Sequence, residues 1–216
     1  MILLRQTSKK AASVKIRGCR IQKWEDRLKQ GLNGTRRTMS REAIEVGAFT
    51  WSRIQRLFDP DATTHWQRCE SEGLQCPQEV FSQLFHEQSN NEDFAVIVRS
   101  IDWGRVRWEL QEISGIAMRH VRVDRGFQHA LDEARNQATR LGIVDERQAV
   151  VDHWRDAKSW IVSPVAVSCD LLGAGCGAGL ELLIGYTRLG NLLALLDREE
   201  VPEIQKHLVW VGKGTA

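Results

Sequence analysis

The sequence predicts an α/β protein of the α+β type, with a mixed sheet and a helical region before it. Three observations support this fold class. Apolar residues make up 42% of the 216 residues, which is enough for a substantial core. Residues 180–213 contain two short apolar segments separated by a stretch with helical spacing, which indicates a strand, a helix and a second strand. Residues 127–141 and 145–154 carry further apolar residues at helical spacing.

Charge divides the chain into a basic arm, residues 1–41, and a mildly acidic body, residues 42–216. The arm holds twelve Lys or Arg and two acidic residues, a net charge of +10, whereas the remaining 18 basic and 26 acidic residues give the body −8. An arm of this kind can follow the phosphates of nucleic acid. A solubilising leader, or an arm folded back on the acidic body, explains it equally well. The residues expected to contact DNA are Lys9, Lys10, Lys15, Arg17, Arg36 and Arg37.

Translation starts either at Met1 or at Met39, because the residues from Met39 onward also have the character of a natural N-terminus. The chain contains no run of about eighteen apolar residues, and its N-terminal apolar run covers only residues 1–4. We therefore expect no membrane insertion, no signal peptide and a cytoplasmic protein. The five cysteines form no C-x-x-C pair, so we expect reduced thiols rather than a zinc site.

The first elements of the body are expected to be mainly helical. Ser40 is a candidate N-cap for a short helix, and the apolar residues of 49–58 have helical spacing. Residues 61–91 are polar and predict a loop with one short helix over 79–86. Residues 94–99 form a continuous apolar run, which predicts a strand.

The middle of the chain gives mixed signals. The pattern of residues 106–113 favours neither a helix nor a strand. The basic residues from 105 to 125 either line a groove or form a solvated face. Residues 127–141 predict a helix that ends at Gly142. Asp145 is then expected to cap a second helix that continues through Trp154.

A glycine-rich segment, residues 172–179, lies between two predicted strands at 165–169 and 180–184. A phosphate-binding loop would need Gly-Lys-Ser or Gly-Lys-Thr and a following helix, and neither is present. We therefore predict a flexible hairpin. After the helix expected over 186–196, residues 207–211 alternate in character and predict the last strand.

The turn at Gly185 is the strongest functional signal. A glycine between a strand and a helix lets the backbone approach a phosphate, and the first helical amides with Arg188 supply a positive field. We expect Gly185, Tyr186, Thr187 and Arg188 to bind phosphate. A purely structural strand-turn-helix unit explains the same residues.

Residues 179–196, GLELLIGYTRLGNLLALL, contain a strand that ends in Gly-x-x-Arg and leads into a helix. Residues 160–165, with Pro164 between apolar neighbours, and residues 200–204, EVPEI, flank this run. The arrangement resembles the ParB/sulfiredoxin-like superfamily over residues 150–213. Tyr186 stands where sulfiredoxins carry their reactive cysteine, which argues against that chemistry.

The resemblance implies a mixed α/β fold that binds a nucleoside triphosphate or a nucleic-acid phosphate over the Gly-x-x-Arg turn. In size the chain is similar to the plasmid fertility-inhibition proteins of the Osa and FiwA type, which inhibit conjugative or T-DNA transfer and have nucleotidase and nuclease activity. Arg188, His207 and Glu181 are then the candidate catalytic residues, with His207 either a general base or structural. Glu181 or Glu203 is a candidate ligand for Mg²⁺.

The expected function is therefore a nucleotide- and DNA-binding protein. ATP or another nucleoside triphosphate is the expected cofactor, with Mg²⁺ as a second candidate, and weak ATPase or nuclease activity is a candidate reaction. DNA is the expected partner, with a component of a transfer or secretion apparatus as a further candidate. The competing interpretation is a non-enzymatic inhibitor or adaptor that acts by protein contact.

Overall fold

The computed structural model describes residues 48–143, 145, 147–173 and 177–215. All of these residues belong to one compact unit, Glu42–Ala216. The basic arm, the DNA-contacting residues expected in it and the helix expected after Ser40 lie outside the described residues. Within the described residues, no helix is both long enough and apolar enough to cross a membrane.

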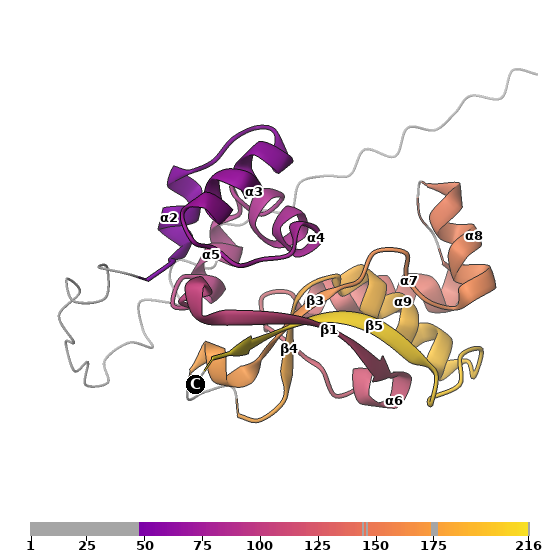
Figure 1. The fold of residues 1–216 in the computed structure, drawn as a ribbon. Helices are drawn as coiled ribbons and strands as arrows, with labels where there is room; N and C mark the ends of the chain where they lie inside the picture. The colour runs from indigo at the N-terminus through magenta and orange to yellow at the C-terminus, as the bar shows by residue number, and fades with distance from the viewer. Residues whose placement is uncertain (1–47, 144, 146, 174–176, 216) are drawn as a thin grey trace, which may run out of the picture. The chain divides into compact units, whose positions relative to one another are not determined.

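The described part of the chain begins with a helical region, drawn from indigo to magenta in Figure 1. A helix within residues 49–58 and a short helix over 79–86 were both predicted, and both are confirmed. The second one is a short α-helix that continues as a π-helix. The segments of this region are α2 (Trp51–Arg56), α3 (Ala62–Ser71), α4 (Gln78–Phe81), the π-helix Ser82–His86 and α5 (Glu92–Val98).

Two predictions for this region are wrong. The strand expected over residues 94–99 is the helix α5, because the side chain of Asn91 caps it by accepting a hydrogen bond from the Phe94 amide at 3.1 Å. Phe94 and Val98, four residues apart, are buried, whereas Val96 between them is 59% exposed, which is a helical burial pattern. The loop expected after Asp61 contains the helix α3, and Asp61 caps it in the same way.

The mixed sheet that the sequence predicted follows, and the structure gives it five strands. The strand order is β1-β5-β3-β4-β2; β1 with β5 and β3 with β4 pair antiparallel, while β3 with β5 and β2 with β4 pair parallel. The antiparallel pairing of β3 and β4 agrees with the hairpin predicted between them. The strands are β1 (Val106–Ser114), β2 (Arg122–Val123), β3 (Val165–Ser168), β4 (Leu180–Ile184) and β5 (Lys206–Gly214).

The helices of the second half are α6 (Gly115–Met118), α7 (Gln128–Leu141), α8 (Gln148–Ala157) and α9 (Tyr186–Asp197). The helices predicted over 127–141 and 186–196 are therefore confirmed. The longer two, α7 and α9, pack closely: a Cβ atom on Gly190 would lie 2.8 Å from the Cβ of Ala134. Figure 1 shows α7 and α9 together beside the sheet.

The core consists of two hydrophobic clusters on opposite faces of the central strands. Val165 and Val167 of β3 and Leu183 of β4 pack with the helical region α2–α5. Ala166 and Leu182, their neighbours in sequence, pack instead with α7, α8 and α9. Successive residues of a strand point to opposite faces, so β3 and β4 separate two layers of helices.

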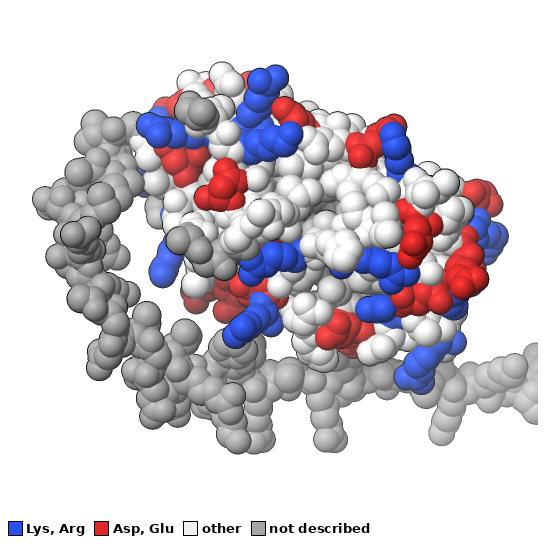
Figure 2. Space-filling view, turned by 90° about the horizontal axis from the view of Figure 1, so that it is seen from below, with Lys and Arg blue, Asp and Glu red and all other residues white. Residues whose placement is uncertain are grey.

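Three of the basic side chains between residues 105 and 125, those of Arg105, Arg107 and Arg119, form ion pairs with carboxylates. Arg105 forms an ion pair with Asp102 at 3.5 Å, and Arg107 with Glu109 at 3.8 Å. On the face shown in Figure 2, basic and acidic side chains lie side by side. These pairs support the interpretation of a solvated, charge-balanced surface over that of a basic groove.

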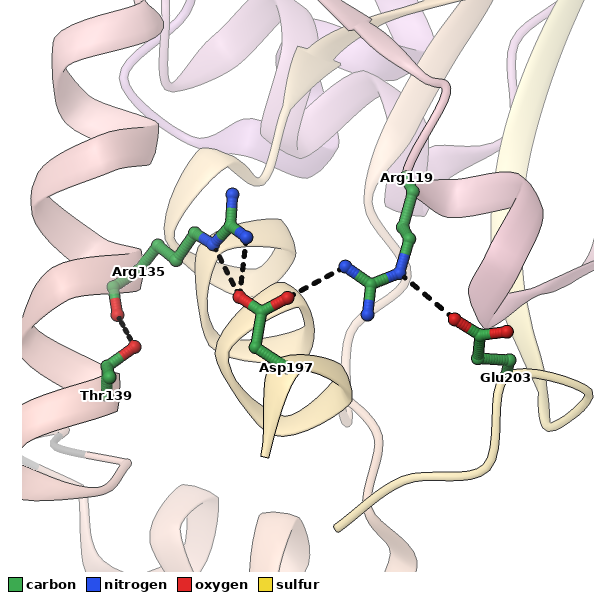
Figure 3. Close-up of polar contacts among 5 residues, drawn as sticks. All are labelled: Arg119, Arg135, Thr139, Asp197 and Glu203. Atoms are coloured by element: carbon green, nitrogen blue, oxygen red, sulfur yellow. Dashed lines mark hydrogen bonds and ion pairs between the residues drawn. The ribbon is translucent and has the colours of Figure 1, made fainter. Parts of the chain in front are cut away.

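Asp197, at the end of α9, joins this helix to α6 and α7 (Figure 3). Its carboxylate accepts hydrogen bonds from Arg119 Nη1 and from Arg135 Nε, each at 2.8 Å, and Arg119 Nε also lies 3.5 Å from Glu203. Burial acts to raise the pKa of Asp197, but the two arginines outweigh it and hold the pKa below its usual value. This network fixes the C-terminal end of α9.

Cysteine chemistry differs in part from the prediction. Cys69 and Cys76 carry free, buried thiols, and burial raises the pKa of both. Cys169 is disulfide-bonded, so the expectation of reduced thiols is wrong for this residue.

Candidate functional site

The turn at Gly185 links β4 to α9 and is built around a close contact. Gly185 has φ +105°, in the left-handed region that favours glycine. A Cβ atom at this position would lie 2.7 Å from the Cβ of Pro164, closer than two such atoms can approach. The backbone conformation and the packing against Pro164 therefore both require glycine, independently of any ligand.

Arg188 has defined partners within the protein. Its guanidinium donates from Nη1 to the carbonyl oxygen of Val162 at 2.7 Å and from Nη2 to Oε1 of Gln83 at 2.8 Å. Burial lowers the pKa of Arg188, and Glu87 and Glu79 act in the opposite direction. An arginine still remains charged in proteins, so a positive charge is held at the start of α9.

The segment before β3 is held by the helical region as well as by Arg188. Gln83 Nε2 donates to the carbonyl oxygen of Ser163 at 3.1 Å, and the Ser163 amide donates to Oε1 of Glu79 at 3.3 Å. Gln83 therefore bridges Arg188 and Ser163 through the two ends of one side-chain amide. The first turn of α9, the segment 162–164 and the π-helix form one connected wall.

A cavity of about 610 Å³ lies against this wall. Its volume is in the range of small-molecule sites, which is roughly 300–1,000 Å³. All four residues predicted to bind phosphate line it, together with residues from the π-helix, α7, α8 and the end of β4. The residues that line the cavity include Gln83, Phe127, Arg147, Gly185, Tyr186, Thr187, Arg188 and Asn191.

The first turn of α9 presents backbone donors at this cavity. The amide of Leu189 donates to the carbonyl oxygen of Gly185 at 2.9 Å, whereas the amides before it precede the i−4 bonding of the helix. The N-cap is Gly185, so no side chain caps these donors. Such amides and the helix dipole favour an anion. Arg147, exposed and paired with Asp145 at 2.9 Å, adds a second cation to the lining.

An aromatic pair also belongs to the lining. The rings of Tyr186 and Phe127 are stacked, with centroids 4.9 Å apart and planes 7° from parallel. Burial raises the pKa of Tyr186, and Asp124 and Glu181 add to this effect, so its hydroxyl stays protonated. The cavity therefore combines the first turn of α9, two arginines and aromatic surface, with the carboxylates of Glu87 and Asp145 also in its lining.

His207 and Glu181 are not among the residues that line the cavity. His207 is 1% exposed, its Nδ1 lies 3.0 Å from Oγ of Ser159, and its ring lies 5.2 Å from that of Trp160. Burial lowers the pKa of His207 to about 4, so the ring is neutral near pH 7. Glu181 lies in β4 opposite Arg122 and Val167, and burial raises its pKa although Arg122 opposes this.

The described residues do not offer a cluster of ligands for Mg²⁺. In the part of the chain that the structure describes, no group of three or more His, Cys, Asp or Glu residues is placed to hold a metal ion. Comparison with known proteins adds no assignment, because no family model, no curated protein and no solved structure matches the chain.

The sequence interpretation missed four residues of this site: Gln83, Phe127, Arg147 and Asn191. Gln83 and Phe127 reach the turn from distant segments, and nothing in their local sequence indicates this. Asn191 does carry a signal, because it is the only polar residue within the run from Leu189 to Leu196. A lone polar residue in an apolar helix indicates either a buried hydrogen bond or a ligand contact.

Proposed function

We propose that this protein binds a phosphorylated small molecule, a nucleoside phosphate, in the cavity at the start of α9. The observation that carries the proposal is the opening of the uncapped first turn of α9, flanked by Arg188 and Arg147, into a cavity of about 610 Å³. Helix amides and arginine side chains are the donors that most often hold phosphate groups in proteins.

The role of Arg188 in this proposal is mainly electrostatic. Its bonds to Val162 and Gln83 use two of its five N–H groups and fix the guanidinium beside the turn. A charge held in place and partly removed from solvent acts more strongly on an anion than a mobile surface charge does. Arg147 can turn toward a ligand, since its side chain is exposed and its ion pair with Asp145 lies at the surface.

The nucleoside part of the ligand is inferred from the rest of the lining. Tyr186 and Phe127 supply aromatic surface on which a base can stack, a contact that tolerates every base. Phosphoester hydrolysis is not part of the proposal, because the cavity lining includes neither His207 nor Glu181. Inhibition of plasmid or T-DNA transfer stays a prediction of the family resemblance.

For the basic arm, residues 1–41, we propose DNA binding through its phosphates. The proposal rests on the net charge of +10 within this arm, beside −8 in the remainder. Such binding is independent of base sequence and strongly dependent on salt.

Calorimetry on the full chain tests the proposed function. The probes are ATP, CTP and inorganic phosphate, each with and without Mg²⁺. Thr187 is exposed, lines the cavity and lies in the first turn of α9. Thr187→Glu places a carboxylate where the anion would bind, yet it suits the helix dipole. We expect nucleotide affinity to fall by about fivefold or more, as for a like charge about 5 Å away.

The matched control is Gln137→Glu, which adds the same charge at an exposed position of α7 outside the cavity lining. This variant is expected to bind nucleotide as the unmodified protein does. Equal weakening by both substitutions would contradict a site at the α9 turn. A folded protein that binds none of the probes would favour the competing function, an inhibitor or adaptor that acts by protein contact.

A further inference from the structure

Asn191 is a buried polar residue without an evident structural role. It is 7% exposed, lies in α9 five residues after Tyr186 and lines the cavity. Across the described ranges its side-chain amide makes no hydrogen bond, yet its nitrogen and oxygen are not among the fully buried atoms that lack a partner, so they are accessible from the cavity. Buried polar side chains are normally hydrogen-bonded. The buried Gln83 follows this rule, since its side-chain amide donates to the carbonyl oxygen of Ser163.

The surroundings of Asn191 make its polarity harder to explain by packing. Leu189, Leu192, Leu193, Leu195 and Leu196 all belong to the hydrophobic cluster on this side of the sheet. An apolar residue at position 191 would satisfy the helix as well as its neighbours do. A side-chain amide at this position needs a hydrogen-bond partner in the cavity, either water or a ligand.

The position of Asn191 in α9 sets the distance between the proposed anion site at the first turn and a second polar contact of the ligand. Thr187 and Asn191 are four residues apart, so they lie on one face of the helix. At a rise of 1.5 Å per residue, Asn191 lies about 6 Å further along the axis than Thr187. A ligand whose anion sits at the first turn can therefore reach Asn191 with a polar group about one sugar ring away.

We propose that the side-chain amide of Asn191 recognises the base of the bound nucleoside phosphate, by pairing with adjacent donor and acceptor atoms on the edge of that base. This inference rests on the proposed function and adds a specificity-determining residue to the same cavity. A side-chain amide offers a donor and an acceptor side by side, which is how asparagine and glutamine recognise adenine in nucleic acids. The phosphate end is then held at the α9 turn, while Asn191 selects among bases.

The test compares AMP with ribose 5-phosphate, which keeps the sugar and the phosphate but lacks the base. Both are titrated into the unmodified full chain and into Asn191→Ala. We expect the unmodified protein to bind AMP more tightly than ribose 5-phosphate. Asn191→Ala should reduce that preference by about tenfold, the size of one good base contact, and leave ribose 5-phosphate binding unchanged.

Two further variants separate recognition from folding. Asn136→Ala removes an exposed asparagine of α7 outside the cavity lining and should change neither affinity. Asn191→Asp keeps the shape but replaces the donor by a charge, so it should lose AMP binding even if Asn191→Ala repacks. Thermal melting of each variant, without ligand, reports whether the fold is intact.

The outcomes for Asn191 and for the proposed function are distinguishable. Binding of both probes with the same AMP preference in Asn191→Ala would overturn the role of Asn191, since water alone then satisfies its side-chain amide. Failure of the unmodified protein to bind either probe would overturn the proposed function, and this inference with it. An AMP preference that Asn191→Ala loses supports both.

Discussion

The guanidinium of Arg188 donates a hydrogen bond to the carbonyl oxygen of Val162 at 2.7 Å. This bond joins the first turn of α9 to the segment that leads into β3, and Pro164 of the same segment packs against Gly185. The glycine and the arginine of the Gly-x-x-Arg sequence therefore hold one backbone segment between them. They shape the wall of the cavity before any ligand is present.

Arg188→Ala is expected to destabilise the fold as well as to weaken anion binding. The substitution removes two hydrogen bonds from a charged donor, one to the exposed carbonyl oxygen of Val162 and one to the partly buried Oε1 of Gln83. We expect the free energy of unfolding to fall by about 3 kcal/mol or more. Urea unfolding, compared with Arg155→Ala, measures this effect. Arg155 is exposed and pairs only with Asp152 among the described residues, so its loss should cost under about 0.5 kcal/mol. Similar losses in the two variants would contradict the structural role.

Gly185→Ala should cost more stability than Gly73→Ala. Both glycines have left-handed backbones, with φ +105° and +102°, so both substitutions carry backbone strain of about 1–2 kcal/mol. Only Gly185 adds a clash, because its Cβ would lie 2.7 Å from that of Pro164, whereas nothing lies within 4 Å at Gly73. Overpacking adds about 1–3 kcal/mol. Denaturant unfolding of both variants measures the difference, and equal losses would show that Pro164 can move aside.

Acid should destabilise the protein through His207. Burial lowers its pKa from 6.5 to about 4 in the folded state, so the unfolded chain binds the proton more readily. Stability is therefore lost as the pH falls from about 6.5 to about 4, by about 2 kcal/mol between pH 7 and pH 5. The pKa of His65 is also lowered by burial and adds in the same direction. His207→Gln isolates the contribution of His207, and it should flatten the pH dependence of unfolding by about that amount. An unchanged pH profile would mean that His207 protonates freely in the fold.

Removal of residues 1–38 should weaken DNA binding evenly across DNA sequences and reduce its salt dependence. For duplex DNA, the slope of log affinity against log salt becomes shallower by about 0.9 for each phosphate that the shortened protein does not neutralise. Titrations at several salt concentrations compare the full chain with one that starts at Met39. Identical slopes would show that the arm makes no phosphate contacts.

The sequence predicted the fold best where one face of an element is buried. The helix α7 has this pattern, whereas α9, β3 and β4 are nearly continuous apolar runs that are buried on all sides and were recognised by their apolar content and their turns. The segment 94–99 failed because a short apolar run suits a strand and a helix equally. Asn91 followed by Glu92 and Asp93 was the missed signal, since a cap and an acidic first turn mark a helix start.

The candidate site was predictable only in its local part. Gly185 and Arg188 stand out because a turn and its helix are contiguous in sequence. Their partners Pro164 and Gln83 come from segments about 20 and 105 residues away, brought together by the sheet order and the packing of the helical region. No local pattern encodes such contacts, so the structural role of the Gly-x-x-Arg turn could be recognised only from the structure.

The most direct test of the nucleotide site is a titration of the ¹⁵N-labelled full chain with AMP, followed by amide chemical shifts. An anion at the start of α9 must perturb the backbone amides of Tyr186, Thr187 and Arg188, because these residues line the cavity and their amides precede the i−4 bonding of the helix. We predict the largest shifts at these amides, with a smaller change at the side-chain amide of Asn191. Shifts that leave the first turn of α9 unchanged at saturation, or that concentrate elsewhere in the chain, would contradict the proposed site.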